Sequence, residues 1–357
     1  MIAPIIPTMP AGTPHTALAT IDFQKLRSDD ADEKQKLLQA ATEAGFFYLN
    51  YENMPEFEDI AATVNGIYDL ERELFDLSDE EKMTYDVDKQ GNMKLSGYKP
   101  IGRNIGGLPG NRDGHESWAI PKNAVFNLTP TNFAHPPLLS SHLPLIHTFM
   151  HHAQTLTTTI HTTLSTHLNL PNISRLEHSH RPTHSSPCIL RLLKVHAQPL
   201  SERGHVHTPH TDMGSITVLF TNEPGLQILT AGDSDWEYVA PRTNCAVVNL
   251  GDALAMLTGG RTKSALHRVA PLPGRAMGTR FSFAYLQRPE MGTRVRVPGP
   301  MCGEEEGEEE EVLIEEWIGR KFGVLRKETF RKGEEWVLTG RNGHGIDLVE
   351  EFYWSLG

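Results

Sequence analysis

Three residues of this chain, His210, Asp212 and His267, have the types and the spacing of a metal site. Residues two apart on a strand point the same way, so His210 and Asp212 can hold one ion from a strand end while a distant strand supplies His267. Two imidazoles and one carboxylate form the facial set that binds ferrous iron and leaves coordination positions open. The pattern therefore predicts a non-haem iron site that can take a co-substrate and dioxygen together.

Other histidines offer competing metal sites. His205 and His207 precede His210, and the three could form a cupin-like site. His147 and His151 are one helical turn apart, but they lie on a mostly polar helix face. The motifs around the later residues favour the first set over both alternatives. An exposed polar surface is expected for His151, His152, His161 and His167.

Composition excludes several classes of protein. The formal net charge of -12 argues against a nucleic-acid binder, which would need basic patches. The three cysteines are far apart and odd in number, and no C-x-x-C is present, so neither a disulfide framework nor a thiolate zinc site is expected. No signal peptide and no uninterrupted apolar stretch of 18 residues are found. We therefore expect a cytoplasmic monomer that binds neither membrane nor nucleic acid.

The first half of the chain reads as a lead-in followed by helices. Residues 1–18 form the lead-in, and residues 30–44 predict a helix that ends at Gly45, a typical C-cap. Phe46 to Leu49 predict a short strand. Two further helices are expected over residues 55–83 and 140–168 from their apolar stripes. Residues 90–127 are expected to be irregular or to form short strands.

Residues 187–288 change character and predict a β-sandwich or barrel. Short runs of β-branched and aromatic residues alternate with turn residues. The expected strands are residues 188–195, 216–220, 226–229, 246–249 and 280–286. All three metal-ligand candidates fall within this block. We expect a mainly β fold with a core braced by flanking α-helices.

The C-terminal part contains an acidic run followed by a helical pattern. Residues 304–311 are all Glu except Gly307, which predicts a solvated loop, with an acidic docking site as the alternative. Residues 315–338 look helical. We expect one domain over residues 19–357, with a helical part at 19–180, the catalytic core at 181–292 and the acidic loop and terminal helix at 293–357.

Arg280 and Ser282 lie on a predicted strand shortly after His267. Alternation places both on one face, while Phe281 and Phe283 lie on the other. Arginine offers a rigid fork of donors that suits a carboxylate, and a neighbouring hydroxyl adds a further polar contact. The pair therefore predicts a carboxylate site near the metal, with a surface arginine on a strand edge as the alternative.

Several motifs together resemble the iron(II)- and 2-oxoglutarate-dependent dioxygenases of the isopenicillin N synthase-like group. They are His-Thr-Asp-Met-Gly-Ser at 210–215, Val-Asn-Leu-Gly-Asp at 248–252, Ser-Ala-Leu-His-Arg-Val at 264–269 and Arg-Phe-Ser-Phe at 280–283. The resemblance implies a double-stranded β-helix, or jelly-roll. It implies that His210, Asp212 and His267 bind Fe(II), and that Arg280 and Ser282 bind the distal carboxylate of 2-oxoglutarate.

The chain departs from this family at one position. Many relatives carry a tyrosine on the strand near residues 190–195 that contacts the same carboxylate. Lys194 or Val195 stands there in this chain. The co-substrate pocket is therefore either rearranged or completed by another group, and Lys194 is our candidate.

The substrate-side segments of the family resemble residues 96–100 and 113–120. The candidates for substrate contact are Tyr98, Ile101, Arg103, Trp118 and Leu286. Trp118 could equally be ordinary core packing, and a surface ion pair is the simpler expectation for Arg103.

The resemblance implies that decarboxylation of 2-oxoglutarate is coupled to oxidation of an unactivated C–H bond by dioxygen. The expected substrate is a small, largely apolar metabolite of natural-product biosynthesis, and the outcome is hydroxylation, desaturation or ring rearrangement. Two alternatives stay open. One is an oxidase of the isopenicillin N synthase type without 2-oxoglutarate, whose substrate brings its own carboxylate to Arg280 and Ser282. The other is a non-catalytic small-molecule binding protein on the same fold.

Overall fold

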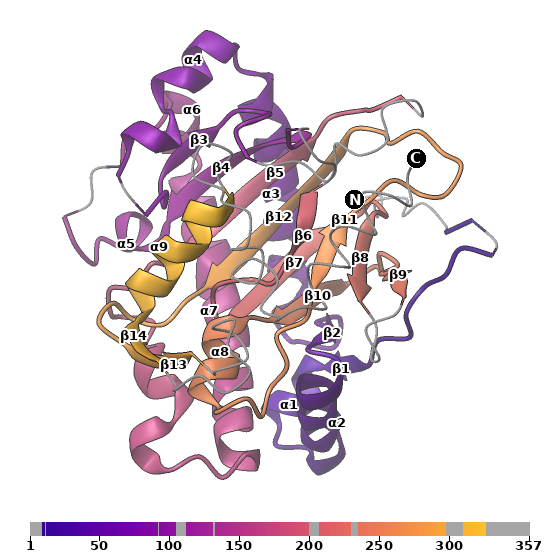
Figure 1. The fold of residues 1–357 in the computed structure, drawn as a ribbon, viewed down its shortest axis with the longest axis vertical. Coiled ribbons are helices and arrows are strands. Elements are labelled where there is room, and N and C mark those ends of the chain that lie inside the picture. The colour runs from indigo at the N-terminus through magenta and orange to yellow at the C-terminus, as the bar shows by residue number, and fades with distance from the viewer. Residues whose placement is uncertain are drawn as a thin grey trace.

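The computed structural model describes residues 9–10, 12–91, 93–104, 112–130, 133–199, 207–229, 235–297 and 310–325. Within this part of the chain, an eight-stranded and a four-stranded sheet form the core (Figure 1). The large sheet has the order β1 (Thr20–Asp22), β2 (Phe46–Asn50), β10 (Cys245–Leu250), β7 (Ile216–Thr221), β12 (Arg280–Gln287), β5 (Ile189–Val195), β4 (His115–Pro121) and β3 (Gly97–Lys99). The small sheet has the order β6 (His207–His210), β11 (His267–Val269), β8 (Leu226–Leu229) and β9 (Trp236–Tyr238).

Apart from the parallel pair β1–β2, the paired strands of these two sheets run antiparallel. The predicted strands at residues 188–195, 216–220, 226–229, 246–249 and 280–286 are confirmed as β5, β7, β8, β10 and β12. Helices cover the large sheet. The architecture is the expected jelly-roll core braced by α-helices.

The predicted helices appear with local signals at their ends. Helix α2 (Ala31–Glu43) begins after Asp30, whose side chain accepts a hydrogen bond from the Glu33 amide. It ends before Gly45, whose φ of 69° lies in the left-handed region that favours glycine. The helix expected over 55–83 is divided into α3 (Phe57–Asp76) and α4 (Asp79–Thr84). The division falls at Ser78, because its side chain caps the Glu81 amide and begins a new helix.

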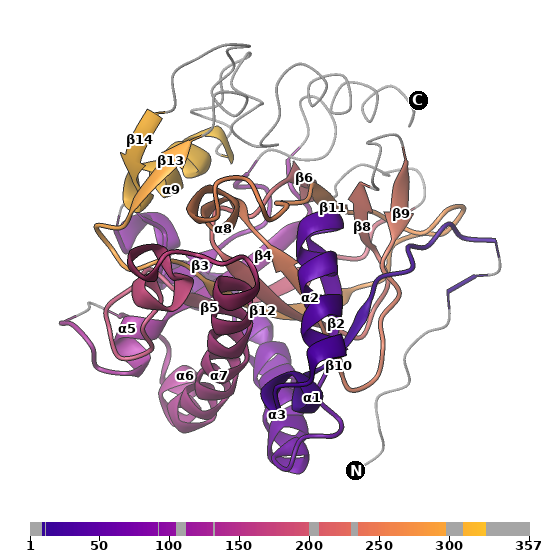
Figure 2. The same cartoon turned by 90° about the horizontal axis from the view of Figure 1, so that it is seen from below.

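Helices α3 and α7 (Leu143–His167) pack against one face of the large sheet (Figure 2). Phe283 of β12 contacts the Tyr68 ring of α3 and the Phe149 ring of α7, with centroid distances of 4.8 and 5.3 Å. All three side chains are buried. Apolar burial on this scale is the main stabilising term of a fold, so these helices fix the large sheet in place.

Shorter elements complete the described part of the chain. They are α1 (Phe23–Arg27), α5 (Lys122–Val125), α6 (Pro137–Ser141) and α8 (Asp252–Leu257), with the 3-10 turns Val87–Lys89, Asn172–Ser174 and Leu176–Ser179. Strands β13 (Arg294–Val297) and β14 (Glu310–Leu313) form a pair, followed by α9 (Ile314–Leu325). These last elements lie on the side of the large sheet opposite to α3 and α7 (Figure 2).

Two expectations for the C-terminal part need adjustment. Glu310 and Glu311 belong to β14 and pair with Arg320 and Arg294, so this end of the acidic run is a strand rather than a loop. Residues 304–309 lie outside the described residues. The predicted helix over 315–338 is confirmed for its first part as α9, and residues beyond 325 are not described.

The prediction of an exposed His161 is wrong. Its side chain is fully buried, and its ring centroid lies 4.1 Å from that of His180. Burial lowers the pKa of His161 well below its usual value, so this imidazole is neutral. No helix in the described residues has both the length and the apolar character needed to cross a bilayer.

Candidate metal centre and its two cavities

The three predicted ligands meet at the junction of the two sheets. His210 ends β6 and pairs directly with His267 of β11, so their side chains emerge side by side. Asp212 follows in the turn after β6. Its Oδ1 lies 3.8 Å from Nε2 of His210 and 4.0 Å from Nε2 of His267. The three ligand atoms lie within 4.8 Å of one another, as the ligands of a single ion require.

Hydrogen bonds leave one atom of each ligand available for a metal. Nδ1 of His210 donates to the Thr208 carbonyl at 2.8 Å, and Nδ1 of His267 donates to the Ala265 carbonyl at 3.1 Å. Each bond fixes the tautomer in which Nε2 carries the free lone pair. The set therefore fits a divalent iron ion bound through the two Nε2 atoms.

The carboxylate of Asp212 is oriented in the same way. Oδ2 accepts hydrogen bonds from Thr217 Oγ1 at 2.6 Å and Asn249 Nδ2 at 2.7 Å. Although burial raises the pKa of Asp212, the neighbouring histidines and these two hydrogen bonds lower it below its usual value. The carboxylate is therefore ionised, and Oδ1 faces the histidines.

The Gly251-Asp252 turn and helix α9 pack against the turn that carries Asp212. A Cβ at Gly251 would lie 2.4 Å from the Gly214 carbonyl oxygen and 2.7 Å from that of Asp212, so only glycine fits. The Asp252 amide donates to the Asp212 carbonyl at 2.8 Å. Lys321 of α9 pairs with the buried Asp252 and donates to the Thr211 carbonyl at 2.8 Å. Helix α9 is thus fastened to the turn that carries the metal ligand.

One cavity extends from the ligands between the two sheets, and we call it the sheet cavity. Its lining includes Leu193, Leu226, Asn249, Arg280 and Ser282, together with His210, Asp212 and His267. The buried guanidinium of Arg280 donates from Nη1 to Ser282 Oγ at 3.0 Å and from Nη2 to Thr221 Oγ1 at 2.9 Å. The structure therefore brings the predicted carboxylate site and the predicted metal ligands into one space. Sequence reasoning missed Thr221, whose signal was its alternation along β7.

The structure does not bring Lys194 to this cavity. Lys194 pairs with Phe281 in the β5–β12 register, so it shares the outer face with that ring rather than the face of Arg280. Its ammonium lies 5.8 Å from the Phe281 ring centroid and 3.7 Å from Glu116 Oε1. Leu193 and Val195 pair with Ser282 and Arg280, so apolar side chains stand where the resemblance led us to expect a polar contact.

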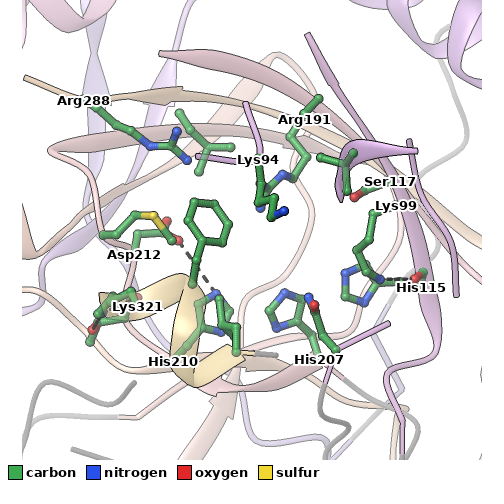
Figure 3. Close-up of a pocket in the computed structure, with 18 of the residues that line it drawn as sticks. Lys94, Lys99, His115, Ser117, Arg191, His207, His210, Asp212, Arg288 and Lys321 are labelled. Atoms are coloured by element: carbon green, nitrogen blue, oxygen red, sulfur yellow. Dashed lines mark hydrogen bonds and ion pairs between the residues drawn. The ribbon is translucent and has the colours of Figure 1, made fainter. Parts of the chain in front are cut away.

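A second cavity opens on the other side of His210 and Asp212 (Figure 3), and we call it the cationic cavity. It is lined by residues of β3, β4, β5, β6, the end of β12 and α9. Cationic side chains in the lining are Lys94, Lys99, Arg191, Arg288 and Lys321. Both cavities share Arg191, His207, His210, Asp212 and Leu286. Leu286, a predicted substrate contact, is therefore at the junction.

Tyr98 and Trp118 lie on the opposite face of β3 and β4 from the cationic cavity. The Tyr98 hydroxyl donates to Glu116 Oε2 at 2.6 Å, and its ring packs 5.3 Å from that of the buried Trp118. Their alternate neighbours Lys99 and Ser117 line the cavity instead. The structure thus places both predicted residues in the core, which for Trp118 is the alternative that the sequence left open.

Ile101 and Arg103 also lie away from the cavity lining. Ile101 is exposed, and Arg103 pairs with Asp86 at 3.1 Å and with Asp88. The simpler expectation for Arg103, a surface ion pair, matches this geometry.

His207 is a neighbour of the ligand set and not a member of it. Its ring stacks on His210 at 4.2 Å and on His115 at 4.7 Å. Burial lowers the pKa of His207 to about 4, so the ring is neutral. Among the described residues, His210, Asp212 and His267 form the group able to hold a metal, which leaves the cupin-like alternative without support. His205 lies outside the described residues.

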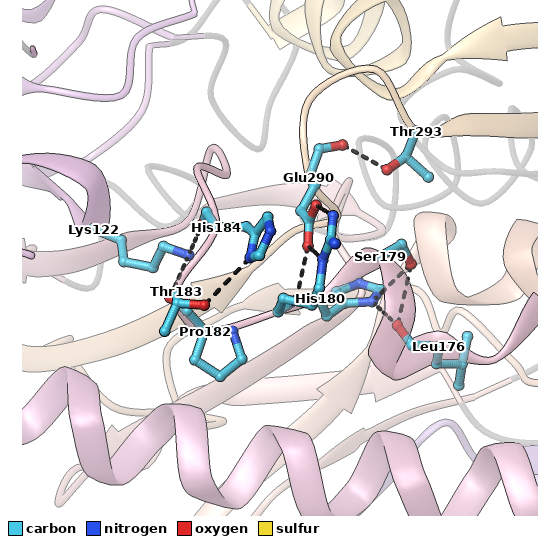
Figure 4. A network of polar contacts seen from close by, with 10 residues as sticks. Lys122, Leu176, Ser179, His180, Pro182, Thr183, His184, Glu290 and Thr293 are labelled. Carbon is cyan, nitrogen blue, oxygen red and sulfur yellow. Dashed lines mark hydrogen bonds and ion pairs between the residues drawn. The ribbon is translucent and has the colours of Figure 1, made fainter. Parts of the chain in front are cut away.

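Sequence reasoning missed Arg288, which directly follows β12, the strand that carries Arg280. Its Nη1 donates to the Pro187 carbonyl at 2.7 Å. A polar network fixes the two segments that meet here (Figure 4): Arg181 pairs with Glu290 at 2.5 Å, and Lys122 donates to the His184 carbonyl at 2.7 Å. The Pro187 carbonyl thus orients the buried Arg288 side chain, which lines the cationic cavity.

A jelly-roll with two histidines and one aspartate at its open end, and a buried Arg-Ser pair nearby, defines the non-haem iron oxygenase class. Comparison with known proteins agrees. Residues 185–289 match the 2OG-Fe(II) oxygenase superfamily, and residues 18–132 match the N-terminal region of the non-haem dioxygenases in morphine synthesis.

Curated relatives extend the match along the chain. The chain is 33% identical to the 2-oxoglutarate-dependent dioxygenase frbH of Dothideomycetidae sp. (strain 11243), over 90% of this chain and 95% of that protein. It is 29% identical to the 2-oxoglutarate-dependent dioxygenase ecdG of Aspergillus rugulosus, over 93% and 96%. The chain therefore belongs to the 2OG-Fe(II) oxygenase superfamily and is an iron- and 2-oxoglutarate-dependent dioxygenase.

Solved structures share the fold. A full-length Neurospora crassa protein in complex with alpha-KG and 5-formyluracil superposes with a TM-score of 0.67 at 23% identity, covering 88% of this chain and 97% of that one. The rice dioxygenase for auxin oxidation gives a TM-score of 0.60 at 20% identity, covering 86% and 96%. These likenesses confirm the predicted jelly-roll.

Proposed function

We propose that His210, Asp212 and His267 hold ferrous iron, and that Arg280 and Ser282 bind the distal carboxylate of 2-oxoglutarate in the sheet cavity. The observation that carries this proposal is the convergence of two Nε2 atoms and one carboxylate oxygen where the two cavities meet. Bound iron would supply the activation of dioxygen that oxidation of an unactivated C–H bond needs.

Hydrogen bonds within the protein orient the side chains that would bind the metal and the co-substrate. Thr217 and Asn249 hold Asp212 so that a single oxygen faces the histidines. Thr221 and Ser282 hold the Arg280 fork against the wall of the sheet cavity. Such pre-positioned polar groups in a buried site cost little reorganisation when the co-substrate arrives.

The two cavities bind different molecules: the sheet cavity takes the co-substrate, and the cationic cavity takes the substrate. The sheet cavity contains the carboxylate site, and its apolar residues Leu193 and Leu226 keep water away from it. The cationic cavity then receives a small organic substrate beside His210 and Asp212. We propose hydroxylation as the outcome, in the biosynthesis of a natural product.

Anaerobic titration of the metal-free protein, first with ferrous iron and then with 2-oxoglutarate, tests this assignment. The expected result is the weak visible absorption band of the metal chelate at about one equivalent of each. Arg280→Ala should weaken 2-oxoglutarate binding by about a hundredfold or more, since it removes one partner of a buried charge pair. Arg242→Ala is the matched control, because its guanidinium lies over the Tyr48 ring and outside both cavities.

The outcomes separate the alternatives. Iron binding without a chelate band would favour an oxidase that uses no 2-oxoglutarate. A failure to bind iron would contradict the ligand assignment. Succinate formed in step with an oxidised product, once a substrate is found, would exclude a purely binding role.

We also propose that residues 19–357 act as one catalytic unit and as a monomer. The main hydrophobic core runs from Ile21 to Tyr285 and includes residues of α3, α7 and the large sheet. Lys321 ties α9 to the turn after β6. Size-exclusion chromatography with light scattering tests the monomer, and limited proteolysis tests the single unit.

A further inference from the structure

The cationic cavity carries an excess of positive charge. Five of its lining residues are lysine or arginine, and Asp212 is its one carboxylate among the described residues. Asp212 is already engaged with His210 and His267 on the metal side. This lining differs from that expected for a largely apolar substrate, and its chemistry suits an anion.

The three lysines of the lining have carboxylate partners of their own. Lys94 pairs with Asp88 at 2.9 Å. Lys99 pairs with the buried Asp113, and Lys321 with the buried Asp252. Their charges are therefore balanced within the protein, and the lysines do not by themselves require a ligand.

Arg288 differs from these lysines. It is 1% exposed, and within the described residues it has no ion pair with a carboxylate. Its Nη1 donates to the Pro187 carbonyl, while its Nε has no hydrogen-bond partner in the described part of the chain. The charge of Asp212 acts on Arg288 from beyond ion-pair distance, and this carboxylate is already engaged with His210 and His267. A buried guanidinium without an ion-pair partner is costly, so this position favours the arrival of an anion.

Arg191 brings a second guanidinium to the same place. It comes from the interior face of β5 and lines both cavities. Figure 3 shows Arg191 and Arg288 on the same side of the cavity, across from His207 and His210. Burial and the nearby charge of Arg191 together lower the pKa of Arg288 to about 10, which leaves it protonated at neutral pH.

We infer that the substrate carries a carboxylate, and that Arg288 and Arg191 hold it in the cationic cavity beside the metal ligands. Each guanidinium presents a planar fork of donors that matches the two oxygens of a carboxylate. The anion would also relieve the repulsion between the two arginines. This inference rests on the proposed function, and it places the oxidised C–H bond close to an acidic group of the substrate.

The test uses Mn(II) in place of iron, saturating 2-oxoglutarate, and benzoate as the probe with benzamide as its neutral counterpart. The relaxation of the probe's ring protons by Mn(II) reports binding next to the triad without any turnover. Benzoate should bind well above benzamide, and Arg288→Gln should weaken benzoate binding about ten- to a hundredfold, the range for a charge-assisted hydrogen bond. Arg288→Lys should restore part of this affinity, and Arg242→Gln should leave it unchanged.

A second variant distinguishes a loss of benzoate binding from a loss of folding. Because Arg288 also holds the Pro187 carbonyl, Arg191→Gln is measured alongside it, and each variant is checked by circular dichroism and thermal unfolding. Equal relaxation of benzoate and benzamide would overturn the inference. So would benzoate binding that survives unchanged in both variants.

Failure of the proposed function gives a different result. In that case Mn(II) would not bind at all, and relaxation of either probe would be absent. Calorimetric titration of the metal-free protein with benzoate and benzamide would still decide whether Arg288 and Arg191 select an acid.

Discussion

The two faces of strands β3, β4 and β5 carry polar residues with different tasks. On the interior face, Lys99 and Arg191 line the cavity beside the metal ligands. On the outer face, Tyr98 and Glu116 are buried and hydrogen-bonded to each other, and the partly exposed Lys194 lies beside Glu116. Adjacent residues of one strand therefore serve either ligand binding or stability, because alternate side chains point to opposite faces. Substitutions on the two faces should separate these properties.

The largest loss of iron binding and activity is expected for the metal ligands, which lie beside the interior face. His210→Ala removes one of three ligands, so we expect iron binding and turnover to be lost. Anaerobic titration with ferrous iron, read by calorimetry, measures this directly. His207→Ala is the matched control, because its ring stacks on His210 but its nitrogen atoms are not in the ligand set. Iron lost equally from both variants would contradict the assignment.

The outer face should respond through stability. Glu116 is buried and accepts hydrogen bonds from Lys82 at 2.9 Å, Tyr98 at 2.6 Å and His196 at 2.8 Å. Glu116→Gln breaks this charge pairing, so we expect the free energy of unfolding to fall by roughly 3 kcal/mol at neutral pH. Denaturant unfolding measures the loss. The affinity for 2-oxoglutarate should stay unchanged.

The same carboxylate predicts a pH dependence. Burial raises the pKa of Glu116, but the hydrogen bonds from His196, Tyr98 and Lys82 outweigh it and lower the pKa from 4.5 to about 2. A depressed pKa stabilises the fold above the unfolded value, and this stabilisation is lost as the pH falls through the folded value. The difference between the wild type and Glu116→Gln should therefore shrink as the pH falls from about 4.5 to about 2. A constant difference across that range would contradict the assigned role.

Strand parity also explains which parts of the site could be predicted from the sequence. Arg280 and Ser282 lie two apart on one strand, and His210 and Asp212 lie two apart at a strand end, so local spacing placed each pair correctly. Tyr98, Trp118 and Lys194 required the parity of three strands whose pairing is set by distant partners. Their neighbours Lys99, Ser117 and Leu193 face the cavities instead.

The cationic cavity was hidden for a related reason. Its residues come from elements that are far apart in the sequence, and their proximity depends on the packing of β12 and α9. Arg191 did carry a local signal, because it is a charged residue between Leu190 and Leu192 in a strand that is buried on both faces. Arg288 shares the parity of Arg280 and Ser282, but β12 ends at Gln287, so contacts with the Pro187 segment rather than strand alternation fix its position.

A moderate effect is expected on the interior face at Ser282. Its hydroxyl accepts a hydrogen bond from Arg280 Nη1 at 3.0 Å, and it lies in the sheet cavity. Ser282→Ala should weaken 2-oxoglutarate binding by about tenfold, the value of one hydrogen bond to a charged group. The chelate band, titrated with 2-oxoglutarate under anaerobic conditions, gives the change in Kd. An unchanged Kd would mean that the hydroxyl only orients Arg280 in the free protein.

The smallest effect is expected at Lys194, on the opposite face of β5. Its side chain is 17% exposed, its ammonium lies beside Glu116 and over the Phe281 ring, and it does not line the sheet cavity. Lys194→Met keeps the length of the side chain and removes the charge. We therefore expect a Kd for 2-oxoglutarate within about twofold of the wild type, because the charge of Lys194 is neutralised locally and screened from Arg280. A tenfold loss, matching that of Ser282→Ala, would show that Lys194 supplies the contact that tyrosine makes in relatives, and the division between the two faces would fail at this strand.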